Sequence, residues 1–318
     1  MLLTRSFVLT ILFIPVHAFA LDVTLYPTGN TADRTAAINQ AVSQIQNSPG
    51  GTGSVILTPG NYYHGGILNV PSGITLRGQN SPASNTTYLI CSSVPTLSPK
   101  TEAICAVKLW GSSPALKWLT IKTTYAGPIE RLSAYRCDGS PAALVWVSYA
   151  SNFYVGGVII ENGCQTGIIV ENSFGTSAFP SVIEYCTVRN TLADGIHLTR
   201  NSAFINVRNC NINRTGDDYI AVVSYRSDGG LCNNIGIYSN TVGLEVGQVW
   251  GRGITVLGGK WISISNNQIS NSYFGGMYLA CEDGFYKTSA AQDVTVQNNT
   301  VTHSNWMRGG ERTAAPLN

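Results

Sequence analysis

The sequence is poor in charged residues: only 11% of its 318 residues are Asp, Glu, Lys or Arg, against about 25% in a typical soluble domain. With a formal net charge of +2, the chain has no basic field to attract nucleic acid, so no nucleic-acid partner is expected. The mean hydropathy is close to zero, which excludes a disordered chain, because disorder combines low hydrophobicity with high net charge. The composition also differs from that of a coiled coil, which is rich in Ala, Glu, Lys and Leu.

Long apolar runs are also missing. The run at residues 7–16 is too short to span a bilayer, since a spanning helix needs about 20 apolar residues. It follows Arg5 and precedes an A-x-A sequence at residues 18–20, which is typical of a secretory signal peptide; an N-terminal membrane anchor is the alternative. We therefore expect residues 1–20 to be removed. The remaining domain, residues 21–318, should be secreted or periplasmic and not bound to a membrane.

The eight cysteines lack the paired C-x-x-C spacing of zinc sites, and no calcium-loop motif is present. We therefore expect no metal and no other cofactor. Export would place the thiols in an oxidising compartment, where disulfides form. Cys186 and Cys210 lie 24 residues apart in similar contexts, which predicts either stacked thiols in the core or a local disulfide. Cys91 and Cys105 flank a Ser- and Pro-rich segment and are predicted to staple a loop.

One helix is predicted near the N-terminus of the mature chain. Its apolar residues recur at i, i+3, i+4 and i+7, namely Ile38, Ala41, Val42 and Ile45. Thr31 or Asp33 could cap its first turn, and Pro49 with the two glycines after it ends the helix. The pattern then changes to short β-rich runs separated by Gly, Asn and Ser, first at residues 54–57, 67–70 and 74–76.

From about residue 150 the chain repeats itself, with a spacing of mostly 22 to 29 residues. Each repeat opens with alternating apolar residues and a polar turn, at residues 158–162, 182–186, 205–209, 235–239, 262–266 and 294–298. Most repeats contain a second strand, at residues 167–169, 195–198, 219–222, 253–256 and 276–279. A period of this length with strands and no helices indicates a solenoid, because one coil cannot bury its apolar face alone.

A solenoid of strands accounts for several other features. Equivalent strands of successive coils would lie about 4.8 Å apart in parallel sheets. The Asn residues that recur at the turns would stack in ladders, since Asn tolerates the left-handed conformation and bonds backbone groups. The N-terminal helix would cover the open end of the first coil, which would otherwise be an exposed edge. A β-sandwich is the competing fold, but its strands would recur about every 8–12 residues without a coil-length repeat.

The chain resembles the right-handed parallel β-helix proteins of the pectate-lyase superfamily over nearly its whole mature length. The resemblance rests on Thr-Ala-Asp-Arg-Thr-Ala-Ala-Ile at residues 31–38 and on Gly-Thr-Gly-Ser-Val-Ile-Leu-Thr-Pro-Gly-Asn-Tyr-Tyr at residues 51–63. It implies an all-β fold, a right-handed parallel β-helix (solenoid) with an N-terminal capping helix. It implies little about the chemistry, because one fold carries many functions.

Three of the 17 acidic residues fall at equivalent positions of two consecutive coils. When residues 193–198 and 216–222 are aligned through their inward side chains, Asp218 stacks on Asp194, and Asp217 lies one residue earlier at the bend. Carboxylates packed this closely raise each other's pKa, which a structural role would hardly require. Hydrolysis of a glycosidic bond does require paired carboxyl groups, one protonated and one ionised. The alternative is an ordinary turn in which the two adjacent aspartates cap backbone donors.

The sequences Ala-Asp-Gly at residues 193–195 and Thr-Gly-Asp-Asp at residues 215–218 are similar to the catalytic motifs of inverting β-helical glycoside hydrolases. The α-1,3-glucanase and mycodextranase family matches best, and the polygalacturonases, with Asn-Thr-Asp-Gly and Gly-Asp-Asp, are a second such family. The resemblance implies that Asp217 is the general acid, while Asp194 and Asp218 hold and deprotonate the water. We expect an acid–base separation of about 6.5–9.5 Å; one near 5 Å would favour retention.

Downstream of these motifs the chain departs from the polygalacturonase pattern. Gly-Arg-Gly at residues 251–253 takes the place of Gly-His-Gly, and no Arg-x-Lys pair follows that would bind a uronate carboxylate. Lys260 is the nearest basic residue. This departure favours a neutral glucan or another glycan over galacturonan as the polysaccharide substrate.

Four further residues are predicted to bind substrate. His197 should face solvent beside the acidic cluster, where it could orient a carboxylate or contact a sugar hydroxyl. Arg252 aligns with the next coil and could hold a carboxylate ionised or bind a substrate oxygen. Tyr219 and Tyr278 lie close to the motifs, and aromatic rings stack on sugars. The alternatives are an exposed histidine, a surface ion pair and aromatic packing within loops.

We therefore expect a monomeric glycoside hydrolase that cleaves a polysaccharide with inversion. One alternative is a polysaccharide lyase or epimerase, in which His197 or Arg252 would be the base and the carboxylates would neutralise a uronate or bind calcium. Another is a non-catalytic glycan-binding β-helix. Glu282 and Asp283, just past the next coil, are either subsite contacts or part of a solvated loop.

Overall fold

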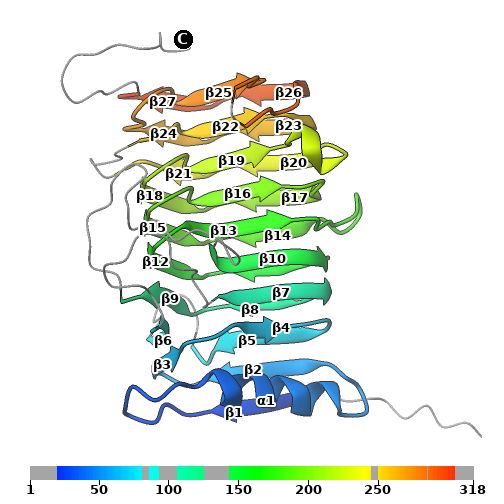
Figure 1. The fold of residues 1–318 in the computed structure, drawn as a ribbon, viewed down its shortest axis with the longest axis vertical. Coiled ribbons are helices and arrows are strands. Elements are labelled where there is room, and N and C mark those ends of the chain that lie inside the picture. Colours follow the sequence, from blue (N-terminus) through cyan, green and yellow to red (C-terminus); the bar gives the residue numbers. More distant parts are fainter. Residues whose placement is uncertain are drawn as a thin grey trace, which may run out of the picture.

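The computed structural model describes residues 20–80, 86–92, 106–124, 143–244, 250–284 and 286–304. Almost all regular structure in these ranges is parallel β-strand, stacked in three sheets along one long axis (Figure 1). Each full turn of the chain contributes one strand to each sheet. Except for Ala20, the predicted signal peptide lies outside the described residues, as does Cys105. Removal of the peptide and the Cys91–Cys105 staple therefore stay predictions.

The three sheets contain ten, nine and eight strands, and within each sheet neighbouring strands are hydrogen-bonded in the order in which they are named. The ten-stranded sheet consists of β1 (Leu21–Leu25), β2 (Gly53–Leu57), β5 (Ile74–Gly78), β8 (Ala115–Lys117), β11 (Tyr154–Gly156), β14 (Ser181–Glu184), β17 (Ala203–Arg208), β20 (Asn233–Tyr238), β23 (Gly259–Ser265) and β26 (Ala291–Gln297). The nine-stranded sheet consists of β27 (Thr300–Thr302), β24 (Gln268–Ser270), β21 (Thr241–Val242), β18 (Asn211–Thr215), β15 (Thr187–Thr191), β12 (Ile159–Gly163), β9 (Thr120–Thr123), β6 (Thr87–Cys91) and β3 (Gly60–His64). The eight-stranded sheet consists of β25 (Met277–Ala280), β22 (Ile254–Leu257), β19 (Ile220–Val223), β16 (Ile196–Thr199), β13 (Thr166–Glu171), β10 (Ala143–Ser151), β7 (Val107–Ser112) and β4 (Leu68–Val70).

The repeating coils contain three strands rather than the two that the sequence predicted. The predicted second strands all belong to the eight-stranded sheet, and all but one of the predicted first strands belong to the ten-stranded sheet. Residues 158–162 are the exception, because they overlap β12 of the nine-stranded sheet. The bends into β15 and β18 take only two residues each, with Tyr185 and Asn209 in the left-handed conformation. So short a bend leaves no break in the apolar alternation, and the third strand was missed.

Residues stack in register from coil to coil. In the eight-stranded sheet Ile168, Ile196, Ile220 and Ile254 are successive partners, and all four are fully buried. Side chains alternate between the faces of a strand, so the next residue of each strand points outward. We call these next residues the outward column; in order they are Lys108, Trp146, Ile169, His197, Ala221, Thr255 and Tyr278.

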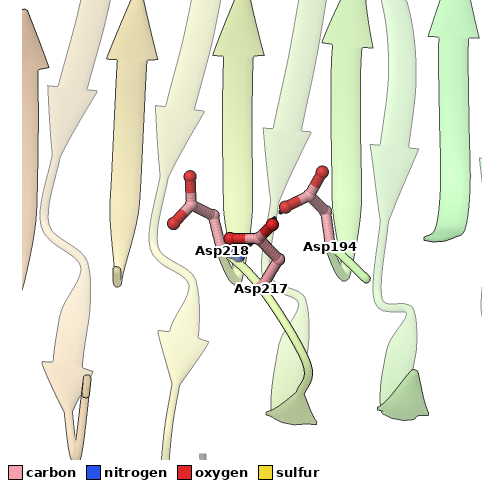
Figure 2. A group of neighbouring side chains, drawn as sticks. All are labelled: Asp194, Asp217 and Asp218. Atoms are coloured by element: carbon pink, nitrogen blue, oxygen red, sulfur yellow. Dashed lines mark hydrogen bonds between the residues drawn. The ribbon is translucent and has the colours of Figure 1, made fainter. Parts of the chain in front are cut away.

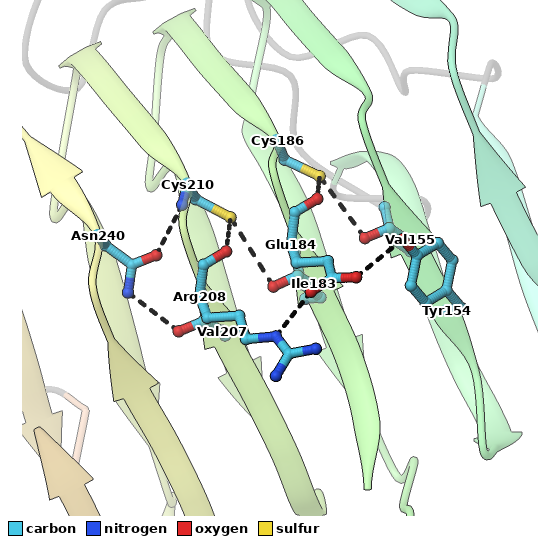
Figure 3. Close-up of polar contacts among 9 residues, drawn as sticks. All are labelled: Tyr154, Val155, Ile183, Glu184, Cys186, Val207, Arg208, Cys210 and Asn240. Atoms are coloured by element: carbon cyan, nitrogen blue, oxygen red, sulfur yellow. Dashed lines mark hydrogen bonds and ion pairs between the residues drawn. The ribbon is translucent and has the colours of Figure 1, made fainter. Parts of the chain in front are cut away.

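A ladder of small polar side chains lies at the bend after the ten-stranded sheet, as the sequence predicted. Asn240 Nδ2 donates to Asn267 Oδ1 at 3.0 Å, and Asn267 Nδ2 donates to Asn299 Oδ1 at 2.8 Å. Cys186 and Cys210 continue the ladder in the two preceding coils, where their thiols donate to main-chain carbonyls (Figure 3). Both are buried free thiols. Of the two predicted alternatives, stacked core thiols are found and a local disulfide is not.

The helix α1 (Thr35–Gln46) lies against the first strands at one end of the solenoid (Figure 1), as predicted. Its buried residues are the four that set the sequence pattern, Ile38, Ala41, Val42 and Ile45. Asp33 Oδ1 accepts the Thr35 N–H at 2.7 Å, so Asp33 supports the start of the helix. Among the described residues, no helix has the length and apolar character needed to cross a membrane.

Candidate active site

The three predicted aspartates lie together where the chain bends from the nine-stranded into the eight-stranded sheet. Asp194 precedes β16, and Asp217 and Asp218 precede β19. Because β16 and β19 pair in register, Asp218 lies beside Asp194, and in Figure 2 the Asp217 carboxylate is seen between the other two. One carboxylate oxygen of each residue lies within 4.8 Å of the others. The predicted stacking is confirmed, whereas the separation of the acid and base carboxyl groups as a whole stays a prediction, because only one oxygen of each is placed this closely.

Hydrogen bonds hold Asp194 from both sides. Its Oδ1 accepts the backbone N–H of Asp218 at 2.9 Å, and its Oδ2 lies 2.7 Å from His197 Nδ1. His197 points outward beside the cluster, as predicted, but its side chain is only 12% exposed. Of the two roles predicted for His197, the geometry shows the first, orientation of a carboxylate. Asp194 is therefore fixed in place by the coil above it and by its own strand.

Asp218 is the most deeply buried of the three, at 4% exposure. Its Oδ1 accepts the backbone N–H of Arg252 at 2.7 Å. Burial, together with the negative charges of Asp217 and Asp194, raises the pKa of Asp218 to about 8, although the nearby Arg252 opposes this rise. The cluster therefore holds a proton near neutral pH, because three adjacent carboxylates cannot all ionise without mutual repulsion.

Asp217 is half-buried and lines the cleft, so its carboxyl is the most accessible of the three. Its main chain is held from two directions. The Thr215 hydroxyl donates to the Asp217 carbonyl at 2.6 Å. On the other side lies Gly251, with φ +103°, where a Cβ atom would lie 2.3 Å from the Asp217 carbonyl carbon and 2.7 Å from the Asp218 nitrogen. Only glycine fits at this position.

Gly251→Ala should therefore shift the Asp217–Asp218 turn. We expect a loss of about 1–3 kcal/mol in unfolding free energy, because a side chain is forced into a strained conformation and against backbone atoms. Chemical denaturation checks this value. Gly229→Ala is the matched control, since Gly229 also has a positive φ but no atom within 4 Å of its Cβ position. Equal losses in the two variants would show that the contact with the turn contributes nothing.

Arg252 connects the cluster to the next coil. Its guanidinium lies 3.6 Å from Asp218, 3.2 Å from Glu282 and 4.3 Å from the Tyr278 ring centre. Burial lowers the pKa of Arg252, but the negative charges of Asp218 and Glu282 outweigh burial and raise it. Arg252 thus stays cationic beside Asp218, but it does not keep the pKa of Asp218 low, and its predicted role in binding a substrate oxygen stays a prediction. Glu282 belongs to the site, whereas Asp283 is 78% exposed on the adjoining loop, where it pairs with Arg226.

The two predicted aromatic contacts lie in different environments. Tyr278 is partly exposed beneath the Arg252 guanidinium. Tyr219 is fully buried, and its hydroxyl donates to the Asn271 carbonyl at 3.3 Å. Its ring has no free face for a sugar, so the prediction that Tyr219 binds substrate was wrong. The bend after Gly216 turns the Tyr219 ring into the core one residue before Ile220.

The cleft beside the aspartates contains residues that sequence reasoning did not select. Its apolar floor consists of Ala221, Val223 and Leu257, and Tyr286 and Thr288 line its far side. The outward position of Ala221 follows from the strand alternation and could have been found. Tyr286 and Thr288 lie outside the repeat, and no sequence signal places them opposite the aspartates.

The aspartates are also the group best placed to hold a metal ion among the described residues, since three carboxylate oxygens converge within 4.8 Å. Carboxylates suit a hard cation such as Ca²⁺ or Mg²⁺. The guanidinium of Arg252, 3.6 Å from Asp218, already supplies positive charge at one side of this cluster. The three carboxyl groups and the guanidinium can thus supply acid–base chemistry with their own protons and charges.

Comparison with known proteins identifies the architecture. A family described as right-handed beta helix region matches residues 126–242. The catalytic unit of a thermostable GH87 α-1,3-glucanase from Streptomyces thermodiastaticus shares 20% identity over 85% of this chain and 44% of that one, with a TM-score of 0.64. A GH87 α-1,3-glucanase catalytic domain in complex with tetrasaccharides shares 16% identity over 91% and 46%, with a TM-score of 0.63. The polygalacturonase from Erwinia carotovora ssp. carotovora shares 16% identity over 93% and 96%, with a TM-score of 0.51.

The comparison with curated protein sequences finds no match. The chain spans less than half the length of the two α-1,3-glucanase structures, but nearly the full length of the polygalacturonase. Sequence identities of this size carry the fold and not the activity. Together with the three stacked parallel sheets, they show that this chain is a right-handed parallel β-helix.

Proposed function

We propose that the protein is a glycoside hydrolase that cleaves a polysaccharide. The observation that carries this proposal is the cluster of three aspartates, whose carboxylate oxygens converge within 4.8 Å but whose burial differs. Carboxyl groups whose surroundings separate their protonation states are the parts that glycosidic hydrolysis needs. The printed names of the similar structures, α-1,3-glucanases and a polygalacturonase, agree with this chemistry.

Each aspartate has a role in the proposed reaction. Asp217 is the carboxyl most accessible from the cleft, so it delivers the proton that the cluster holds to the glycosidic oxygen as that bond breaks. Asp194 and Asp218, held by backbone and side-chain hydrogen bonds, position a water molecule against the anomeric carbon. The ionised member of this pair takes the proton of the water as the new C–O bond forms.

Burial favours a single displacement by water, and therefore inversion. Asp194 and Asp218 line the cleft but are only 8% and 4% exposed, less than Asp217. A retaining mechanism would need a second carboxylate that reaches the sugar carbon. Distance alone, the short separation of the carboxylate oxygens, would favour retention. The anomeric configuration of the product therefore distinguishes inversion from retention. Proton NMR of the first product, recorded before mutarotation, should show the opposite anomeric configuration to the substrate.

The charges in the cleft favour a neutral glycan. Four acids, Asp194, Asp217, Asp218 and Glu282, line it together with Arg252, which already pairs with two of them. A uronate would bring further negative charge next to these carboxylates, and like charges repel at this range. We propose a neutral glucan, with α-1,3-glucan as the first to test because it is named in two of the similar structures.

A lyase or epimerase is the second candidate, and the site supports it less. Its predicted bases were His197 and Arg252. A guanidinium acts as a base only if its pKa falls, and the pKa of Arg252 is raised by Asp218 and Glu282. His197 Nδ1 lies 2.7 Å from Asp194, which leaves Nε2 for a base, so the ultraviolet readout of the screen below tests this candidate. A non-catalytic glycan-binding role would leave the crowding of the aspartates unexplained.

One screen separates these candidates. The purified protein is incubated with α-1,3-glucan and with polygalacturonate, and both new reducing ends and ultraviolet absorbance are measured. A hydrolase produces reducing ends without absorbance, because only a lyase creates a double bond. Absorbance in step with reducing ends would overturn the proposal, and binding without new ends would favour the non-catalytic role.

We further propose that residues 1–20 direct export and that residues 21–318 form the mature domain.

A further inference from the structure

The outward column changes from accessible to covered at the three aspartates. Every member from Lys108 to His197 is partly exposed. The next two members, Ala221 and Thr255, are 1% and 0% exposed. The last member, Tyr278 on β25, is partly exposed beneath the Arg252 guanidinium, and the eight-stranded sheet ends there. Among the described residues, a polysaccharide lying along this column therefore finds accessible side chains on the N-terminal side of the aspartates and covered ones directly beyond them.

Two loops build much of the cover, and we call them the wall. They comprise residues 224–231, which follow β19, and residues 281–284 and 286–289, which follow β25. Tyr225 and Thr288 form a β-bridge, and the Ser289 N–H donates to the Ser224 carbonyl at 2.8 Å. The wall therefore joins two coils that are not neighbours, across the one between them.

An ion pair links the two loops of the wall, and a glycine beneath them leaves room for their contact. Arg226 forms an ion pair with Asp283, and its Nε donates to the Thr288 carbonyl at 3.1 Å. Beneath the junction lies Gly258, with φ +88°, where a Cβ atom would lie 2.8 Å from the Ser289 carbonyl oxygen. The middle coil thus turns without a side chain at the point where the two loops meet.

We propose, on the basis of the proposed function, that the pocket behind the wall receives the terminal unit of a polysaccharide, so that the protein acts at chain ends. The cavity measures about 110 Å³, which is small against the roughly 300–1,000 Å³ of common ligand pockets. Its floor of Ala221, Val223 and Leu257 suits the apolar face of one sugar ring. The guanidinium of Arg252, stacked on Tyr278, closes its C-terminal side.

The rest of the polysaccharide lies along the open part of the column, with Trp146 as its platform. Trp146 is two strands from His197, or about 10 Å. The orientation of its ring is fixed, because Nε1 donates to Glu171 at 2.8 Å and the Lys108 ammonium lies 4.1 Å from the ring centre. Glu171 is itself held by Arg200 at 2.7 Å. An aromatic ring fixed in this way is suited to stacking on a sugar unit.

The proposal is tested on α-1,3-glucan and polygalacturonate, by the sizes of the products, by two variants of Trp146 and by one control variant. We expect one short product from the earliest time points, with viscosity falling slowly relative to the new reducing ends. Trp146→Ala should raise KM for the polymer by about three- to tenfold and leave KM for the shortest cleaved oligosaccharide unchanged. Trp146→Phe, which keeps a ring, should recover most of this loss. Trp261→Ala is the matched control, since Trp261 has a lysine ammonium 4.2 Å from its ring but lies in the ten-stranded sheet.

The outcomes distinguish cleavage at chain ends from the proposed hydrolase function on which it rests. A ladder of product sizes with an early fall in viscosity would overturn cleavage at chain ends while leaving the hydrolase intact. Equal effects of Trp146→Ala on polymer and short oligosaccharide would overturn the platform. A wild-type protein that releases no reducing ends from either polymer would overturn the hydrolase itself, and chain-end action with it.

Discussion

Asp217→Asn should lower kcat by about 10²–10⁴-fold, the usual contribution of a positioned general acid. The amide has the shape of the carboxyl group but cannot deliver a proton to the glycosidic oxygen. Because Asp217 is half-buried and lines the cleft, the change leaves the core packing unaltered. Initial rates of reducing-end release by the variant and by the wild-type protein measure the loss.

A substrate with a better leaving group distinguishes loss of the acid from loss of the fold. An aryl glycoside with an activated phenol needs little protonation, so the variant should recover most of its rate on it. Asp293→Asn is the matched control, because Asp293 is an exposed aspartate of β26 outside the cluster, and it should retain full activity. Full activity of Asp217→Asn on the polysaccharide would remove Asp217 from the mechanism.

Asp218→Asn should make the protein more stable at neutral and alkaline pH while abolishing most of its activity. In the folded protein the pKa of Asp218 is raised to about 8 from an ordinary value of 3.8. Between these two values the folded state binds more protons than the unfolded state, so stability falls as pH rises. An asparagine stays neutral, and its carbonyl can still accept the Arg252 N–H, so the variant escapes this loss.

Thermal unfolding at several pH values measures the effect. At pH 8 the variant should melt at least about 2 °C above the wild-type protein, which corresponds to somewhat over 1 kcal/mol in a chain of this size. The difference should shrink as the pH is lowered through 3.8, below which the wild-type carboxyl is protonated in both states. A variant less stable than wild type at pH 8 would show that Asp218 is held ionised by Arg252 instead.

The periodic part of the molecule could be predicted from the sequence. In a solenoid, residues one period apart become neighbours, so the alignment of two motifs predicted that Asp218 lies beside Asp194. The same logic predicted the Asn ladder and the inward rows of isoleucine. The third strand of each coil was missed because its bend takes only two residues and leaves the alternation unbroken.

Other features of the site could not be predicted because they break the period. Tyr219 was expected to bind substrate from its nearness to the motif, but the bend before Ile220 turns its ring into the core. Glu282 is the partner of Arg252 on the next coil, but the sequence left open whether it contacts substrate at a subsite or belongs to a solvated loop. Tyr286 and Thr288 are brought to the cleft by a loop without a counterpart in the other coils.

The sequence alone therefore determined the three-aspartate cluster and the two coils that carry it, because neighbours in stacked coils follow from spacing along the chain. Only the tertiary structure decided which aspartate is most exposed, which tyrosine is accessible and where the cleft is closed. Those properties depend on loops that meet across a coil, such as the contact between Ser224 and Ser289, and on the burial that these contacts produce. Burial also sets the pKa of Asp218, so the chemistry of a cluster that spacing predicts is decided by the packing around it.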